Sequence, residues 1–191
     1  LVGSETLGQT VGSTFSDKNV GTGKTVTVNS ITLADGGNGG LALNYSISSG
    51  QTTTANITAK ALTVSGITAS DKTYDGSTSA TLGTGSVSYG GLVSGDTLTG
   101  TFSGVFNNAN VGTGKTVTIT SSYGGTDVNN YTITDQASTT ADIFKKALTA
   151  AASASNKVYD ASSTATTTLT FTGLIGSETL GQTVGSTFNN K

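Results

Sequence analysis

The sequence of 191 residues contains no Cys, Pro, Met, Trp or His, and all nine basic residues are Lys because Arg is also missing. Without Cys, neither a disulfide framework nor a thiol nucleophile is available. Without His, general-base chemistry would depend on Asp, Glu and Lys alone, and their order in the sequence suggests no catalytic set. The residue inventory therefore argues against an enzyme, and we expect no cofactor.

Charge is also scarce. Charged residues make up 10% of the chain and the net charge is −2, whereas globular proteins average about 25% charged residues. Nucleic-acid binding requires a basic patch of Lys and Arg, which this composition does not supply. No apolar run approaches the roughly 20 residues that span a bilayer. We therefore expect neither a nucleic-acid partner nor membrane insertion.

The residues that are abundant are small and polar. Gly contributes 27 residues, hydrophobic residues make up 34%, and Thr, Ser and Asn fill much of the remainder. Thr is β-branched and suits a half-exposed strand, while Ser, Asn and Gly favour turns. The composition predicts an all-β protein with an uncharged polar surface, which favours export to the bacterial cell surface.

Internal repetition is the strongest pattern in the sequence. One segment, Gly3–Phe15, returns unchanged as Gly176–Phe188. Three shorter motifs recur 91, 86 and 85 residues later: Val20–Thr27 as Val111–Thr118, Lys60–Thr63 as Lys146–Thr149, and Lys72-Thr-Tyr-Asp75 as Lys157-Val-Tyr-Asp160. A period near 86 residues is too long for a solenoid repeat and indicates one small domain per repeat.

The repeat divides the chain into three parts. Residues 61–146 form one complete unit, residues 1–60 the C-terminal part of the unit before it, and residues 147–191 the N-terminal part of the next. We therefore expect the chain to begin and end in mid-repeat. Since each partial unit exposes strand edges that the other could fill, we also expect head-to-tail self-association between copies.

Alternating apolar and polar residues predict about seven short strands per unit. The apolar positions expected to face inward include Leu41, Leu43, Tyr45, Ile47, Leu62, Val64, Val117 and Ile119. Such strands favour tandem Ig-like antiparallel β-sandwich modules in an elongated array, with β-grasp-like or single curved-sheet modules as the alternative. The Ala-rich stretch 143–154 is interpreted as a strand that runs into the next unit.

Two motifs suggest ligands and are better explained by turns. Gly21-Thr-Gly-Lys-Thr25 resembles the end of a phosphate-binding loop, but the required earlier Gly is replaced by Lys18 and a strand follows instead of a helix. Asp71, Asp75 and Asp96 are the candidate metal ligands, for Ca²⁺. No calcium-loop spacing accompanies them, so we expect turn chemistry and no bound metal.

Three sequons of the Asn-x-Ser/Thr type occur, at Asn44, Asn56 and Asn130. They are candidate glycosylation sites. The simpler interpretation is that Asn begins or interrupts a strand.

The ordered motifs resemble the YDG repeat family of large bacterial haemagglutinin-like and biofilm adhesins, many of which are two-partner secretion exoproteins. The motifs that carry the resemblance are Ser70–Gly76, Gly95-Asp96, Val20–Lys24, Asn130–Ile133 and Thr140–Ile143. The second copy departs from the pattern because Ala161 follows Tyr159-Asp160, which argues against a strict need for Gly after the Tyr-Asp pair.

The resemblance implies an extracellular structural role. The expected function is a stalk or fibre in a secreted surface adhesin that supports attachment or a biofilm matrix, with neighbouring copies of the repeat as partners. The alternative is a repeat that itself binds extracellular polysaccharide. Carbohydrate platforms present exposed aromatic residues, and six Tyr and six Phe are few for that purpose.

Overall fold

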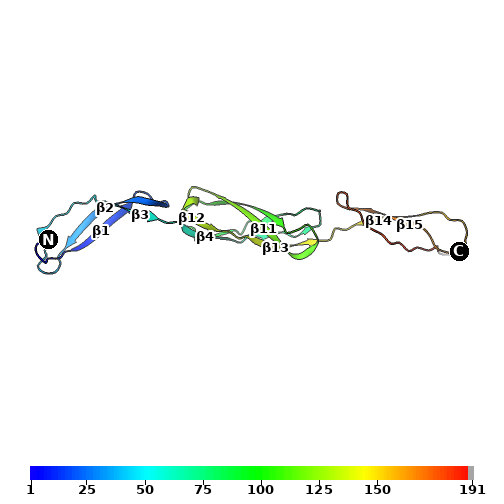
Figure 1. The fold of residues 1–191 in the computed structure, drawn as a ribbon, viewed down its shortest axis with the longest axis horizontal. Helices are drawn as coiled ribbons and strands as arrows, with labels where there is room; N and C mark the ends of the chain where they lie inside the picture. The colour runs from blue at the N-terminus through cyan, green and yellow to red at the C-terminus, as the bar shows by residue number, and fades with distance from the viewer. Residues whose placement is uncertain (189–191) are drawn as a thin grey trace. The chain divides into compact units, whose positions relative to one another are not determined.

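The computed structural model describes residues 1–188, and nearly all of its regular structure is β-strand (Figure 1). The strands are β1 (Gly8–Phe15), β2 (Gly21–Ala34), β3 (Thr52–Ile57), β4 (Lys60–Ser65), β5 (Thr68–Ala69), β6 (Lys72–Thr73), β7 (Ser79–Ala80), β8 (Leu82–Gly83), β9 (Ser88–Gly90), β10 (Thr99–Phe106), β11 (Gly112–Gly124), β12 (Tyr131–Thr134), β13 (Ser138–Phe144), β14 (Thr149–Ala154) and β15 (Thr167–Thr172).

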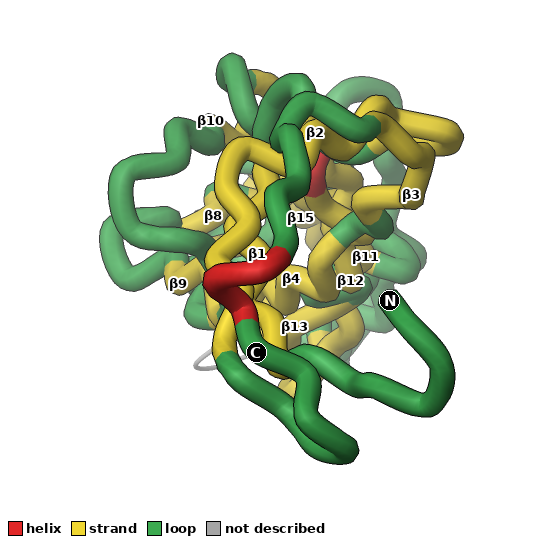
Figure 2. The backbone as a smooth tube through the Cα atoms, turned by 90° about the vertical axis from the view of Figure 1, so that its left-hand side faces the viewer, coloured by secondary structure: helices red, strands yellow, loops and turns green. Residues whose placement is uncertain are grey.

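The all-β class expected from composition is confirmed. Helix within residues 1–188 is limited to two 3₁₀ turns, Ala42–Asn44 and Val128–Asn130, which are the red segments of the tube in Figure 2. None of the helical segments in this part of the chain has the length and apolar character needed to cross a membrane.

The strands form several small sheets. Their strand orders are β1-β2-β3, β6-β13-β11-β10-β7, β12-β4-β9, β14-β15 and β5-β8. Most pairs are antiparallel, as expected, but β12 pairs with β4 and β13 pairs with β6 in parallel. Parallel pairing arises here because the opening strands of the central repeat lie beside its closing strands, after a long connection.

Contacts divide the chain into two compact units. Unit 1 comprises residues 1–65, 88–101 and 122–135, and unit 2 comprises residues 66–87, 102–121 and 136–191. Strands β10 and β11 contribute residues to both units. The repeat boundaries at residues 60/61 and 146/147 were drawn from the periodicity of the sequence and not from contacts. They stay a prediction.

The apolar core of unit 2 is small. Phe106, Val117, Ala141 and Ile143 are buried together, with Tyr74 among the half-buried residues packed against them. The inward positions predicted in the central repeat are confirmed, because Leu62, Val64, Val117 and Ile119 are all buried.

The same alternation fails in residues 41–47. Leu41, Leu43 and Ile47 are 45%, 87% and 51% exposed, and Ala42–Asn44 is a 3₁₀ turn where a strand was expected. Among the described residues no strand pairs with residues 45–48.

The Ala-rich stretch is extended, as predicted, but it is not one continuous strand. Strand β13 ends at Phe144 and β14 begins at Thr149. The interruption falls where the chain leaves the five-stranded sheet and enters the sheet of β14 and β15.

Candidate functional site

The turn after β6 is closed by a lysine. Lys72 Nζ donates to Asp75 Oδ1 at 2.8 Å, to the carbonyl and hydroxyl oxygens of Ser77 at 2.9 and 3.0 Å, and to the Ser79 carbonyl oxygen at 3.1 Å. Its ammonium group also lies 5.6 Å from the centre of the Phe106 ring, within cation–π range. One side chain therefore joins the Tyr-Asp-Gly turn to a core aromatic residue.

The second copy of the motif builds the same turn. Lys157 Nζ donates to Asp160 Oδ1 at 2.8 Å and to both oxygens of Ser162 at 2.9 Å. It lies 5.5 Å from the centre of the Phe188 ring. Because the two turns use equivalent residues in the same way, the Tyr-Asp motif marks a structural unit of the repeat.

These contacts shift the acidity of both aspartates. The hydrogen bond from Lys72, followed by that from the Ser77 backbone N–H, lowers the pKa of Asp75 to about 2. Lys157 and the Ser162 backbone N–H lower the pKa of Asp160 to about 2 in the same way. Both carboxylates are held in the charged form by the turn that they close.

The residue after the Tyr-Asp pair has a left-handed backbone in both copies. Gly76 has φ of +75° and Ala161 has φ of +60°. Ala161 shows that a residue other than Gly can adopt this conformation, which agrees with the expectation that Gly is not strictly required. The conformation is nevertheless strained for a residue with a Cβ.

The lysine of each Gly-Thr-Gly-Lys motif fastens the loop that precedes its strand. Lys24 Nζ donates to Asp17 Oδ1 and, at 2.7 Å, to the Asn19 carbonyl oxygen. Lys115 Nζ donates to Asn108 Oδ1 at 2.7 Å. The motif lies at the start of β2 and of β11, and no helix follows it. The turn interpretation is therefore wrong for the motif itself, which lies in the first residues of the strand; the loop precedes it.

A bulge in each of these strands is closed by a side chain from the neighbouring strand. The register shifts between Gly21 and Lys24 and again between Gly112 and Lys115. The Gly23 N–H donates to Asn56 Oδ1 at 2.8 Å, and the Gly114 N–H donates to Asp142 Oδ1 at 2.7 Å. Asn56, a candidate sequon, thus has a structural role that Asp142 fills one repeat later.

A tyrosine hydroxyl joins the C-terminal part of each repeat to a loop in its middle. Tyr131 donates to Asp96 Oδ2 at 2.6 Å and accepts from the Val93 N–H at 3.0 Å. Tyr45 makes the equivalent bonds, donating to Glu5 and accepting from the Val2 N–H at 3.1 Å. Burial, followed by the hydrogen bond to Asp96, raises the pKa of Tyr131.

Lys18 contacts two nearly buried carboxylates in unit 1. Its ammonium group lies 3.2 Å from Asp96 Oδ1 and 3.1 Å from Asp127 Oδ1, while the lysine side chain itself stays 70% exposed. The Thr97 N–H and then Lys18 lower the pKa of Asp127. Because Lys18 belongs to the hairpin of β1 and β2, this ion pair links that hairpin to the central repeat.

The proposed calcium ligands are separately engaged. Asp71 Oδ1 accepts from the Asp142 N–H at 2.7 Å, Asp75 is bound by Lys72, and Asp96 is bound by Lys18 and Tyr131. Across residues 1–188, no three His, Cys, Asp or Glu side chains lie close enough together to hold a metal ion. Sequence reasoning missed the role of the lysines, although Lys72 and Asp75 lie in one repeated motif, because the motif does not show that the two side chains bind each other.

The remaining sequons differ in exposure. Asn44 is exposed at the end of the first 3₁₀ turn. Asn130 is half-buried, and its Oδ1 accepts from the Val20 N–H at 2.9 Å. The side-chain oxygens of Asn56 and Asn130 thus accept hydrogen bonds from backbone N–H groups.

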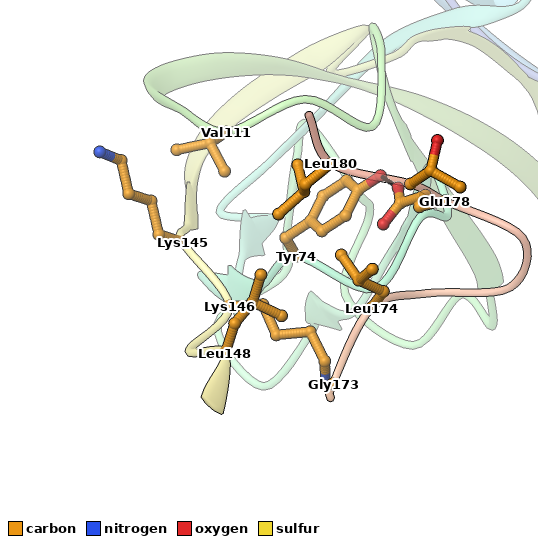
Figure 3. A pocket seen from close by; sticks show the side chains of 10 residues that line it. Tyr74, Val111, Lys145, Lys146, Leu148, Gly173, Leu174, Glu178 and Leu180 are labelled. Atoms are coloured by element: carbon orange, nitrogen blue, oxygen red, sulfur yellow. Dashed lines mark hydrogen bonds between the residues drawn. The ribbon is translucent and has the colours of Figure 1, made fainter. Parts of the chain in front are cut away.

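Unit 2 contains an open groove of about 450 Å³ (Figure 3). Its lining is mostly apolar and includes Leu148, Leu174, Leu180 and the ring of Tyr74, whose hydroxyl donates to Glu178. A second groove, in unit 1, shares three repeat-equivalent positions with the first, because Val20, Lys60 and Asp96 correspond to Val111, Lys146 and Glu178. The remaining residues of the two linings are not equivalent.

Comparison with known proteins gives a family. The model of the YDG domain matches residues 1–55 and again residues 58–141. No curated protein and no solved structure matches the chain. Each of the two successive matches contains one of the Gly-Thr-Gly-Lys bulges, at Lys24 and Lys115, and the chain belongs to the YDG domain family.

Proposed function

We propose that this chain is part of the repetitive structural region, a stalk or fibre, of a secreted bacterial surface adhesin. In this role it would act outside the cell and support attachment or a biofilm matrix. The tandem Ig-like modules in an elongated array, and their boundaries at residues 60/61 and 146/147, belong to the same proposal.

The observation that carries the proposal is the structural use of the repeated polar residues. Lys72 and Lys157 close equivalent turns, and Tyr45 and Tyr131 hold equivalent loops. A region that serves as a spacer requires modules that fold alike, and it needs no chemistry at its motif residues. The exposed polar surface and the membership of the YDG family agree with this role.

A polysaccharide-binding repeat is the second candidate. It is favoured by Tyr159, which is 78% exposed beside Val158 at 89%, because exposed aromatic rings stack on sugars. The equivalent Tyr74 is half-buried against the core of unit 2. The tyrosine of this motif is therefore exposed in one repeat and covered in the other, so the repeats would not share one sugar site. This difference favours the spacer role.

Two measurements test the proposal. Labelling of unpermeabilised bacteria with an antibody against this chain is expected to stain the cell surface, and deletion of the repeats from the gene is expected to reduce surface attachment. Intracellular staining alone would contradict the proposed location.

Glycan-array binding separates the two candidates. The spacer role predicts no saturable binding by the chain. Saturable binding that is lost in Tyr159→Ala and kept in Tyr74→Ala would instead support the polysaccharide-binding repeat.

A further inference from the structure

The loop that follows β2 contains a tight turn at Asn38-Gly39. The Gly40 N–H donates to the Gly37 carbonyl oxygen at 3.2 Å. The two residues between them, Asn38 and Gly39, have φ of +56° and +86°. Positive φ at both central residues is typical of a type I′ turn, for which Asn-Gly is a preferred pair. A second hydrogen bond, from the Gly36 N–H to the Gly40 carbonyl oxygen at 2.9 Å, closes the loop around this turn.

The turn belongs to one copy of the repeat. The path from Val20 to Asn44 covers 24 residue steps. The equivalent path from Val111 to Asn130 covers 19 steps, so the first copy carries five additional residues. Asn38 is also the only Asn of the sequence that is followed by Gly. The turn therefore distinguishes this copy from the central repeat.

The Asn38 amide holds the turn against residues 4–6. Its Nδ2 donates to the Ser4 carbonyl oxygen at 2.9 Å. Two further hydrogen bonds lie beside it, from the Thr6 N–H to the Gly37 carbonyl oxygen at 3.1 Å and from the Gly37 N–H to Thr6 Oγ1 at 2.8 Å. The side-chain nitrogen of Asn38 thus contributes to the set of bonds that joins this loop to the segment before β1.

The backbone nitrogen that follows Asn38 is open. Asn38 and Gly39 are both exposed, and a Cβ placed on Gly39 would meet no atom within 4 Å. Among the hydrogen bonds of residues 1–188, none has the Gly39 N–H as its donor. Glycine also carries no side chain beside its nitrogen. Nothing in this part of the chain therefore shields the Asn38 side-chain carbon Cγ from the Gly39 nitrogen.

We propose that Asn38 is a site of spontaneous deamidation through a cyclic imide. The Gly39 nitrogen gives its proton to hydroxide and bonds to Asn38 Cγ. The Cγ–Nδ2 bond then breaks, and Nδ2 leaves as ammonia after it takes a proton from water. Water finally opens the imide at Cγ to give Asp, or at the main-chain carbonyl carbon to give isoaspartate. Water is the only co-reactant, and the modification does not rest on the proposed function.

Either product removes the bond to Ser4. An ionised carboxylate only accepts hydrogen bonds, so it cannot donate to the Ser4 carbonyl oxygen as the Asn38 amide does. Isoaspartate also adds a carbon atom to the main chain inside a turn that the Gly40 to Gly37 hydrogen bond closes. Because ammonia is released, the change is irreversible in water. Deamidation therefore loosens the loop of this copy permanently.

The Tyr-Asp-Gly turn contains the related pair Asp75-Gly76 and is protected from the same reaction. Imide formation from Asp requires a protonated carboxyl group, because hydroxide is a far poorer leaving group than water. Hydrogen bonds from Lys72 and from the Ser77 N–H lower the pKa of Asp75 to about 2, and both reach Asp75 Oδ1. At neutral pH this carboxylate is charged and engaged, so Asp75 is expected to stay unmodified.

Incubation of the folded full chain in mildly alkaline buffer, followed by peptide mass spectrometry, tests the proposal. Trypsin releases Asn38 and Asn44 in one peptide, residues 25–60, because Lys24 precedes it and Lys60 ends it. Over time, NH₂ is expected to be exchanged for OH at Asn38, with both isoaspartate and Asp among the products. Asn44 is the internal control, since it is exposed but precedes a Tyr, and it is expected to stay unchanged.

Two variants separate the chemistry from its consequence. Asn38→Gln retains an amide donor, but its cyclisation requires a larger ring and is much slower, so this variant is expected to show no change at the position. Asn38→Asp reproduces one product. Hydrogen exchange at the Thr6 and Gly37 N–H groups is expected to be faster in Asn38→Asp than in the wild type. Equal exchange in the two proteins would overturn the loosening of the loop.

The urea-unfolded chain is the reference for the effect of the turn. Modification of Asn38 in the unfolded chain alone would show that the folded turn protects this residue, and it would overturn the proposal. Equal modification of Asn44, or formation of Asp without isoaspartate, would exclude the route through the Gly39 nitrogen. Deamidation of the folded chain at Asn38 alone, with isoaspartate present, would support it.

Discussion

A single lysine, Lys72, binds acceptors on three residues and lies beside one aromatic ring, so it determines the turn that follows β6. Lys157 repeats this arrangement. At the residue scale, the repeat is specified by small polar clusters of this kind. The lysines in these clusters donate hydrogen bonds to backbone carbonyl oxygens. The few charged residues of the chain therefore include several with a structural role.

The acidity of Asp75 and Asp160 predicts a pH dependence. Both pKa values fall from 3.8 to about 2 in the folded chain. The stability that they contribute is therefore fully present above about pH 4 and is lost as the pH falls through 2. Thermal melts between pH 5 and pH 2 are expected to show a falling midpoint, and the double variant Asp75→Asn/Asp160→Asn is expected to show a smaller fall. Equal slopes for the two proteins would contradict the assignment.

Because each Tyr-Asp turn contains a left-handed residue, substitutions at Gly76 and Ala161 are expected to change stability in opposite directions. Gly76→Ala is expected to destabilise the fold by about 1–2 kcal/mol, and its new Cβ would meet Ile175 Cγ2 at 2.9 Å. Ala161→Gly removes the same strain and is expected to stabilise by up to about 1 kcal/mol. Denaturant melts measure both, and a stabilising Gly76→Ala would refute this account of the turn.

At the scale of elements, β10 shows how the two faces of one strand differ. Phe106 is 2% exposed in the unit 2 core, while the adjacent Val105 is 48% exposed. Phe106→Ala is expected to cost about 3–5 kcal/mol, because it leaves a cavity and removes the ring beside Lys72. Val105→Ala serves as the control and is expected to change stability by less than about 1 kcal/mol. Urea unfolding measures the stability of both variants. Equal losses of stability for the two variants would contradict the account that one face of β10 is buried and the other exposed.

The sequence allowed most of the strands in the central repeat to be predicted, because Leu62, Val64, Val117 and Ile119 alternate and are buried. It did not allow the prediction of the parallel pairs, since alternation indicates which face of a strand is buried but not which strand lies beside it. The expected strand at residues 41–47 is absent for the same reason. Tyr45 and Ile47 have the right pattern, but no partner lies along them in the described structure.

At the scale of the whole molecule, the separate engagement of the acidic residues predicts little response to calcium. Asp71, Asp75 and Asp96 each bind protein donors, so a bound ion would have to break these contacts. Millimolar Ca²⁺ is expected to move the melting temperature by less than about 2 °C, whereas a rise of about 10 °C would indicate a true site.

The central claim is that the chain is an array of structural modules with a period near 86 residues. Single-molecule stretching of the full chain tests it most directly, because a module unfolds in one cooperative step. The account predicts a discrete event that releases residues 61–146, about 300 Å of extended chain. Gradual extension without such an event, or a released length unrelated to the repeat, would contradict the account.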